Sequence, residues 1–276
     1  MKLKYLGTGA FEGIPFLYCK CKACENARKK KGKELRTRSG LILDDKIAID
    51  FSADSYSNLV KYDVDFAVIE HVLITHTHED HFSPSDLVQR FVLRPEGVAE
   101  KLCIYGNASV KKKFFRLDAW CERIMDFVSL KTLKREEKVD IGGYKVTPFY
   151  VEHMREEDCY VYLIEKDGRA YLHLMDSSEP TEKLYDYLSE NNVHLDAVTM
   201  DCTYGSLTTE YFGHMNIWQN IRVKNTLQKL GVANQDTKFV CTHFSHFSVN
   251  DTHETLCQIA AKNCLIIAYD GMDMEF

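Results

Sequence analysis

The chain has 276 residues, of which 45% are apolar and 28% are charged, and its formal net charge is −6. A chain of this length and composition can bury a substantial core within one large α/β unit. Its mildly acidic charge argues against a general nucleic-acid binder, which needs a basic surface, and no apolar run approaches the roughly 20 residues of a membrane span.

Short apolar runs alternate with helical patterns along the chain. Turn-forming residues predict two hairpins, at Asp44-Asp45 and at Lys166-Asp167-Gly168. Helices are predicted from Ser83, with Pro84 at the first helical position, over Glu179–Asn191, and from Asn216 to Leu230. This order fits both a single-sheet Rossmann layout and a two-sheet sandwich flanked by helices. The predicted strands are Lys2–Leu6, Gly40–Leu43, Lys46–Ile49, Val72–Ile74, Lys101–Tyr105, Tyr144–Val151, Tyr160–Ile164, Ala170–Met175, Ala197–Met200, Phe239–Thr242 and Leu265–Tyr269.

Three cysteines near the beginning of the chain, Cys19, Cys21 and Cys24, form a C-x-C-x-x-C cluster in a polar loop. The sequence shows no export signal, so we expect a cytoplasmic, reducing location in which clustered thiolates bind metal. Three thiolates supply three corners of a tetrahedral structural zinc site, and His246 is predicted to supply the fourth. A disulfide within the cluster is the alternative.

Four of the predicted strands run directly into histidine or aspartate residues. A buried strand fixes the position of the residue just past its end, so these side chains are expected to meet in one crevice at the sheet edge. Imidazole nitrogens and carboxylate oxygens suit zinc, manganese or iron. Four ligands on one short loop are too crowded for one ion, so the sequence predicts two adjacent metal ions with one carboxylate bridging them. The candidate ligands are His76, His78, Asp80, His81, His153, Asp176 and His243.

The segment His76-Thr77-His78-Glu79-Asp80-His81 resembles the HxHxDH signature of the metallo-β-lactamase superfamily. The resemblance extends over nearly the whole chain and implies a four-layer αββα sandwich with its active site at the sheet edges. It also implies one metal on His76, His78 and His153, a second on Asp80, His81 and His243, and Asp176 bridging both. Asp50 matches an aspartate that orients a ligating imidazole. Asp201 is the rival candidate for the bridge.

The cysteine cluster narrows the resemblance to one branch, the phosphoribosyl cyclic phosphodiesterases of the carbon–phosphorus lyase pathway. Features shared with that branch are Leu6-Gly7-Thr8-Gly9, the cysteine cluster, His243 with His246, and Tyr269-Asp270-Gly271-Met272. The branch also has a histidine at the place of His214, which we expect to donate a proton to the leaving group or to bind substrate. His214 and the metal ligand Asp80 are thus the predicted catalytic residues.

These features predict a metal-dependent hydrolase, foremost a phosphodiesterase acting on a small cyclic or nucleotide-like phosphodiester. Hydrolysis of a lactone or thioester on the same two metals, and RNA processing by a nuclease, are the alternatives within the fold. A non-catalytic metal-binding protein is the alternative from another class. We expect one domain over residues 1–276, with a Cys-rich zinc loop inserted at about 15–35, no membrane partner and no nucleic-acid partner, and leave a homodimer open.

Overall fold

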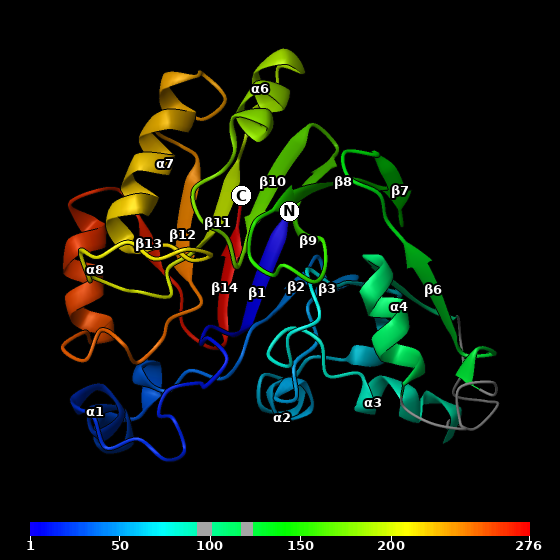
Figure 1. Cartoon of the computed structure of the whole chain (residues 1–276), viewed down its shortest axis with the longest axis horizontal. Helices are drawn as coiled ribbons and strands as arrows, with labels where there is room; N and C mark the ends of the chain where they lie inside the picture. Colours follow the sequence, from blue (N-terminus) through cyan, green and yellow to red (C-terminus); the bar gives the residue numbers. More distant parts are fainter. Residues whose placement is uncertain (93–100, 117–123) are drawn as a thin grey trace.

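The computed structural model describes residues 1–92, 101–116 and 124–276, and its strands form two sheets (Figure 1). Every strand pairs with its neighbour in a defined register. In the order of their pairing, the strands of the first sheet are β14 (Met272–Glu275), β1 (Lys2–Gly7), β2 (Gly40–Leu43), β3 (Ile47–Ile49), β4 (His71–Leu73), β5 (Leu102–Gly106) and β6 (Val128–Thr132). Those of the second sheet are β13 (Ile266–Ile267), β12 (Lys238–Thr242), β11 (Ala197–Asp201), β10 (Arg169–Leu174), β9 (Cys159–Lys166), β8 (Tyr144–Val151) and β7 (Val139–Ile141).

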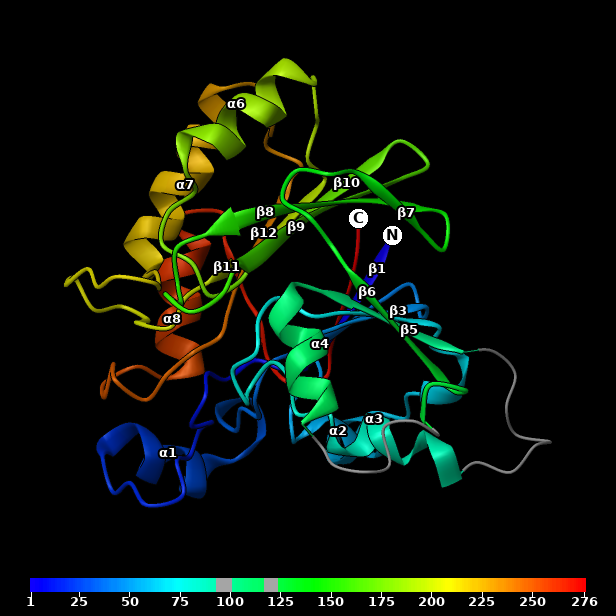
Figure 2. The same ribbon diagram turned by 45° about the vertical axis from the view of Figure 1, so that its right-hand side comes forward.

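The two sheets face each other, and helices cover their outer faces (Figure 2). The helices on the first sheet are α2 (Ser55–Lys61), α3 (Ser85–Val88) and α4 (Ala108–Phe115). Those on the second sheet are α6 (Glu182–Glu190), α7 (Ile217–Lys229) and α8 (His253–Ala261). Connecting segments contain α1 (Lys22–Lys30) and the 3₁₀ turns η1 (Gly32–Glu34), η2 (Phe66–Val68) and η3 (Gln89–Val92). The predicted αββα sandwich is thereby confirmed.

The alternating direction of side chains along the strands explains why the fold has four layers. In β9, Tyr160, Tyr162 and Ile164 point between the sheets, whereas Val161 and Leu163 point toward the helices α6, α7 and α8. Successive side chains of a strand lie on opposite faces, so a strand that is apolar at every position is buried on both. The second sheet therefore needs the first sheet on one face and helices on the other.

The predicted strands are present, with ends that agree or are shifted by one or two residues, but several elements were missed or overextended. Strands β6, β7 and β14 were not predicted, because each is a short edge element or carries many polar residues. The helix predicted from Ser83 is only the four-residue α3, and Pro84 lies before its first turn rather than within it. Among the described residues no helix is long and apolar enough to cross a membrane.

The last predicted strand, Leu265–Tyr269, contains only the two-residue β13. Beyond it, the Asp270 carboxylate accepts hydrogen bonds from the backbone N–H groups of Thr8 (2.9 Å) and Thr37 (2.6 Å). Gly271 then adopts a φ of +88°, a conformation that favours glycine. These contacts turn the chain out of the second sheet and into the first, where it ends as β14.

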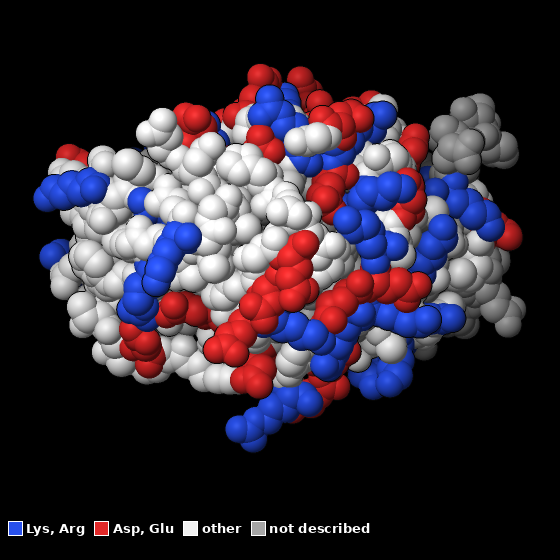
Figure 3. Space-filling model, turned by 90° about the horizontal axis from the view of Figure 1, so that it is seen from above, with Lys and Arg blue, Asp and Glu red and all other residues white. Residues whose placement is uncertain are grey.

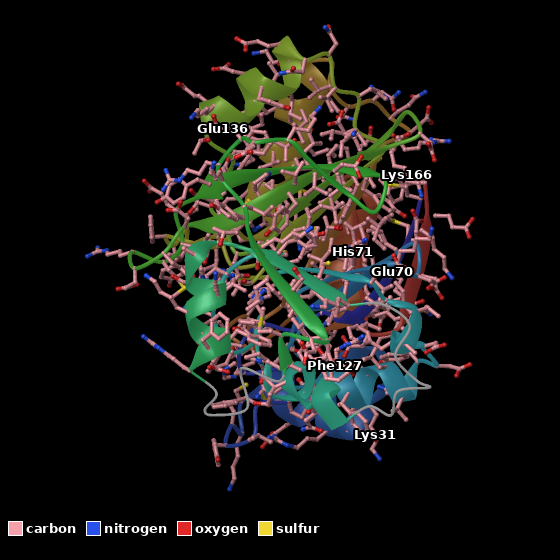
Figure 4. All side chains as sticks on the ribbon, turned by 90° about the vertical axis from the view of Figure 1, so that its right-hand side faces the viewer. Lys31, Glu70, His71, Phe127, Glu136 and Lys166 are labelled. Atoms are coloured by element: carbon pink, nitrogen blue, oxygen red, sulfur yellow. The ribbon has the colours of Figure 1, made fainter. Side chains whose placement is uncertain are left out.

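The sheets also approach closely at the ends of the strands far from the metal ligands. There His71, at the start of β4, lies against Gly142, where a Cβ atom would come within 2.5 Å of the imidazole Nε2. Burial lowers the pKa of His71, and the nearby Glu70 only partly opposes this. Figure 4 shows Glu70 and His71 next to each other where the sheets meet. This contact is structural.

Candidate metal centre

The carboxyl-terminal ends of β4, β8, β10 and β12 meet at one edge of the sandwich. Each is followed within a few residues by predicted ligands, so strands far apart in sequence bring seven side chains together. A backbone hydrogen bond from Tyr160 N–H to Thr75 O, 3.0 Å long, ties the two sheets together at this edge. The loop that carries the first ligands is held by Glu157, whose carboxylate accepts from the Thr77 backbone at 2.7 Å.

The first cluster consists of His76, His78, His153 and Asp176. The Nδ1 atom of His78 lies 2.9 Å from His76 Nε2 and 3.1 Å from His153 Nε2. The Asp176 Oδ2 atom lies 3.5 Å from His76 Nε2 and 3.4 Å from His153 Nε2. Ligands about 2.0–2.1 Å from a tetrahedral zinc ion are about 3.3 Å apart, so these four atoms have the separations of one coordination shell.

The second cluster consists of Asp80, His81, His243 and again Asp176. The Nε2 atoms of His81 and His243 are 3.2 Å apart. Asp176 lies 3.2 Å from His81 through Oδ2 and 3.0 Å from His243 through Oδ1. Its two oxygens thus reach both clusters, which is the arrangement of a bridging carboxylate.

The chemistry of these donor atoms fits cations. Among the described residues, the buried Asp80 Oδ1 has no hydrogen-bond partner, and Asp176 Oδ1 makes no well-aligned hydrogen bond despite lying 3.0 Å from His243 Nε2; this would be costly unless an ion satisfied them. Burial lowers the pKa of His76, His78 and His153, so these imidazoles are neutral and able to ligate.

The second cluster stabilises positive charge by itself. Although burial disfavours the charged imidazole, Asp176, Asp80 and Asp50 raise the pKa of His81 well above its usual value. The charge of Asp176 and hydrogen bonds to Asp201 and Asp80 likewise outweigh burial and raise the pKa of His243 to about 10. A site that favours a proton this strongly also favours a metal cation in its place.

In four of the ligand histidines, the Nδ1 atom, which does not face the metal position, lies within hydrogen-bond distance of an oxygen. This contact fixes the orientation of the ring. Asp50 was predicted in this role, and its Oδ2 lies 2.6 Å from His81 Nδ1. The other three partners were not predicted. Thr75 Oγ1 lies 3.0 Å from His76 Nδ1, Gly213 O lies 3.2 Å from His153 Nδ1, and Thr203 Oγ1 lies 2.8 Å from His243 Nδ1.

The backbone is left-handed at three residues of this centre, with φ of 62° at Asp50, 44° at Asp176 and 62° at His243. Such conformations are uncommon outside glycine, asparagine and aspartate, and they cluster at functional sites. Here each follows the end of a strand and turns the side chain toward the ligand cluster.

The partly exposed His214 and the buried Asp201 form a pair beside the second cluster. Asp201 Oδ2 lies 2.8 Å from His214 Nδ1, and the His214 ring stacks on the His243 ring at 5.7 Å. Burial opposes the charged form, but Asp201 outweighs it and raises the pKa of His214. Asp201, the rival candidate for the bridge, instead accepts hydrogen bonds from Thr203 N–H (3.0 Å) and Met215 N–H (2.9 Å).

The structure also brings Cys19, Cys21, Cys24 and His246 together, with their ligand atoms within 4.8 Å of one another. We call these four residues the clip. Cys21 Sγ lies 3.5 Å from His246 Nδ1, close to the about 3.6 Å expected for two ligands of a tetrahedral zinc. None of the cysteines in the described parts of the chain forms a disulfide.

The sequence predicted that the three cysteines of the clip lie in a loop, but two of them belong to the beginning of helix α1. Cys21 caps the N-terminus of α1, and Cys24 lies on its buried side. Burial tends to raise the pKa of Cys21, but hydrogen bonds from the Cys24 backbone and from His246 lower it to about 7. The helix was missed because only Ala23, Cys24 and Ala27 of its nine residues are buried, too few to give an apolar pattern.

A Cys21→Ser variant is expected to lose one zinc per chain and to unfold at a lower temperature. Loss of a structural site is worth about 3 kcal/mol, which corresponds to a fall of roughly 5–10 °C in Tm for a chain of this size. Elemental analysis and thermal unfolding of the purified protein measure both. Cys264→Ser, which removes an exposed thiol, is the control and should change neither quantity. Unchanged zinc content in Cys21→Ser would contradict the clip.

The metal centre opens into a cavity of about 290 Å³. His78, Asp80, His153, Asp176, His214 and His243 form its floor, and Phe11, Glu12, Thr203, Tyr204 and Phe247 are among the residues around them. No lysine or arginine is found among the described residues that line it. The cavity therefore has the size of a small ligand, and its own side chains contribute carboxylates and imidazoles.

Known proteins share this architecture. The model of the β-lactamase superfamily domain matches residues 49–267. A diphosphatase of the PhnP family is similar over 100% of this chain and 97% of its own, with 22% identity and a TM-score of 0.76. Zn²⁺-bound PqqB from Methylobacterium extorquens is 18% identical over 100% of both chains, with a TM-score of 0.75. Yeast PDE1 is 18% identical over 100% of this chain and 99% of its own, with a TM-score of 0.65. No curated protein sequence matches the chain.

Proposed function

The chain belongs to the β-lactamase superfamily and is a metal-dependent hydrolase of the metallo-β-lactamase fold, and we propose that it is a phosphodiesterase for a small cyclic or nucleotide-like phosphodiester. The observation that carries this proposal is the sharing of Asp176 by two ligand clusters beside the His214–Asp201 pair. Members of both clusters (His78, His153, Asp80 and His243), the shared Asp176 and His214 line one small cavity. The similar diphosphatase, named for a phosphorus-containing substrate, supports the same class of reaction.

The ligand sets assign the residues that would hold two catalytic metals. His76, His78 and His153 would bind one, and Asp80, His81 and His243 would bind the other, with Asp176 on both. Two divalent ions (zinc, manganese or iron) would, when bound, lower the pKa of a water molecule and neutralise charge on the phosphate oxygens. A separate zinc would occupy the clip.

His214 is suited to the proton transfer that the leaving group needs. An alkoxide leaves readily only if it is protonated as the P–O bond breaks. Asp201 raises the pKa of His214, which favours the protonated ring, and it lies 2.8 Å from Nδ1 of this histidine at the cavity. Loss of the proton to the leaving oxygen would then be followed by reprotonation from solvent.

The charge distribution favours a small substrate over a nucleic acid. On the face shown in Figure 3, Lys and Arg side chains alternate with Asp and Glu, and no continuous basic stripe is visible. The described lining of the cavity also contains no lysine or arginine that could contact the successive phosphates of a nucleic-acid backbone. The unpaired thiols of the described chain further support a reducing, cytoplasmic location.

A direct comparison of substrates tests the proposal. The metal-loaded protein is expected to hydrolyse bis-(p-nitrophenyl) phosphate, and to act on lactones and thioesters far more slowly. Hydrolysis of a lactone or thioester with no action on the phosphodiester would favour the carbonyl alternative. Tight, salt-dependent binding of RNA would instead favour the alternative of an RNA-processing nuclease. If the metal-loaded protein hydrolyses none of these compounds and does not bind RNA, the alternative of a non-catalytic metal-binding protein would be favoured.

A further inference from the structure

Aromatic side chains gather at the mouth of the cavity. Phe11, Tyr204 and Phe247 come from three different loops and line it together, and we call them the aromatic rim. The exposed fraction is 58% for Phe11 and 56% for Phe247. Exposed aromatic area next to a reactive centre is typical of a surface that is covered when a ligand binds.

Two members of the rim, Tyr204 and Phe247, are held in place by other rings and by a hydrogen bond between their loops. Tyr204 packs against Tyr211 with ring centroids 4.6 Å apart and planes tilted by 38°, and its plane is within 19° of that of Phe247. Phe247 in turn stacks on His246 of the clip, at 5.4 Å and 26°. The loops of Tyr204 and Phe247 are joined by a hydrogen bond of 3.1 Å from Ser245 N–H to Thr203 O. Rings fixed in this way lose little conformational entropy on binding.

The charges around the rim select against an anionic partner. Glu12 lies at the same mouth, hydrogen-bonded to Ser245 and 3.4 Å from the His246 backbone nitrogen. The described lining has no lysine or arginine, and Glu12 is its charged side chain outside the metal centre and His214, so a second phosphate or a carboxylate held at the rim would meet this negative charge. A neutral, flat group would instead gain contact with two nearly parallel rings.

We propose that the aromatic rim binds a flat aromatic or heteroaromatic ring, such as a nucleobase, carried by one ester of the phosphodiester. This inference rests on the proposed function, since it places the phosphodiester at the metal centre and the ring at Phe11, Tyr204 and Phe247. The cavity of about 290 Å³ then holds the phosphate and its sugar, and the ring lies on the rim at the opening. The preferred substrate class is a cyclic phosphodiester of a nucleoside.

The test compares three compounds with the same phosphodiester and the same leaving oxygen: the cyclic 2′,3′-phosphates of adenosine, of a phenyl riboside and of methyl riboside. Stacking of a base is worth about 1–3 kcal/mol, so kcat/KM should be about 5- to 150-fold higher for adenosine than for methyl riboside. A phenyl riboside as good as adenosine would show that any flat ring suffices. A phenyl riboside as poor as methyl riboside would show that the rim takes a nucleobase.

Variants of the rim provide the second arm. Phe247→Leu and Phe11→Leu keep apolar bulk but remove a ring face, and each should lower the adenosine preference severalfold, chiefly through KM. Phe247 packs against the clip ligand His246, so Phe247→Leu could destabilise the clip, whereas no ring contact joins Phe11 to His246 in the described part of the chain. The Phe11→Leu variant therefore still tests the rim if Phe247→Leu proves unstable. Tyr56→Ala removes an aromatic residue of α2 that is 70% exposed, and it should leave the preference unchanged.

Equal kcat/KM values for adenosine and methyl riboside in the wild type would overturn the inference, and so would a preference that survives both rim variants. If no compound is hydrolysed, the proposed function fails. In that case calorimetric dissociation constants of the same three compounds still test the rim, because the compounds remain intact. Tighter binding of adenosine that is lost in Phe11→Leu would support the ring site even then, and equal affinities would refute it.

Discussion

An Asp176→Asn variant is expected to lose about a thousandfold of kcat/KM toward phosphodiesters and to hold fewer catalytic metals per chain. Asp176 belongs to both ligand clusters, so its substitution weakens both metal positions at once. Charge stabilisation by metal ions is worth several kcal/mol, and about 1.4 kcal/mol corresponds to a tenfold change in rate. Steady-state kinetics and elemental analysis of the same preparation measure the two effects.

Asparagine suits this experiment because it has nearly the volume of aspartate and tolerates the left-handed backbone of residue 176, where φ is 44°. Asp167→Asn is the matched control. Asp167 also has a positive φ, of 50°, but it lies in the turn between β9 and β10, away from the ligands. Full activity in Asp176→Asn would mean that the two clusters do not act as one dinuclear site.

Substitution of His214 should affect substrates according to their leaving group. A general acid contributes about 10²- to 10⁴-fold, so His214→Gln should lower kcat by that factor for adenosine 2′,3′-cyclic phosphate, whose leaving group is an alkoxide. The loss should be much smaller for bis-(p-nitrophenyl) phosphate, because p-nitrophenolate leaves without being protonated. Parallel kinetics on the two substrates measure the difference.

Equal losses on both substrates would show that His214 binds the phosphodiester rather than protonating the leaving group. Asp201→Asn provides a further readout, since Asp201 contacts His214 at 2.8 Å and the loop around it, with a longer contact of 3.5 Å to His243. The Asp201→Asn variant should also lose more kcat toward adenosine 2′,3′-cyclic phosphate than toward bis-(p-nitrophenyl) phosphate, but by a smaller factor than His214→Gln. His194→Gln is the control, because His194 lies far from the centre and contacts Asn234.

The ligands of the metal centre could be predicted because strand ends are encoded locally. A run such as Val72-Leu73-Ile74 is apolar enough to be a buried strand, and the polar residues after it must then lie at the sheet edge. His153, Asp176 and His243 could be predicted in the same way, because each also follows the end of an apolar run. The placement of all seven candidates around two positions therefore depends on features that one sequence contains.

The remaining features depend on contacts between distant segments. Thr203 reaches His243 only because two loops of the second sheet are hydrogen-bonded together, and no pattern around residue 203 indicates this. Left-handed backbone at Asp50 and His243 is imposed by the surrounding fold rather than by the residue type. The aromatic rim was missed for the same reason, since its three members are separated by about 190 and 40 residues in sequence.

The position of β14 determines when the first sheet can be completed during synthesis. β14 pairs with β1 in antiparallel register, with Lys2 opposite Glu275, and the two strands lie side by side in Figure 1. Strand β1 therefore keeps one edge unpaired on the ribosome until Met272–Glu275 have emerged, and an exposed edge is a template for association with other chains. The segment after β13 that carries the chain from one sheet to the other thus decides how long the nascent protein remains prone to aggregation.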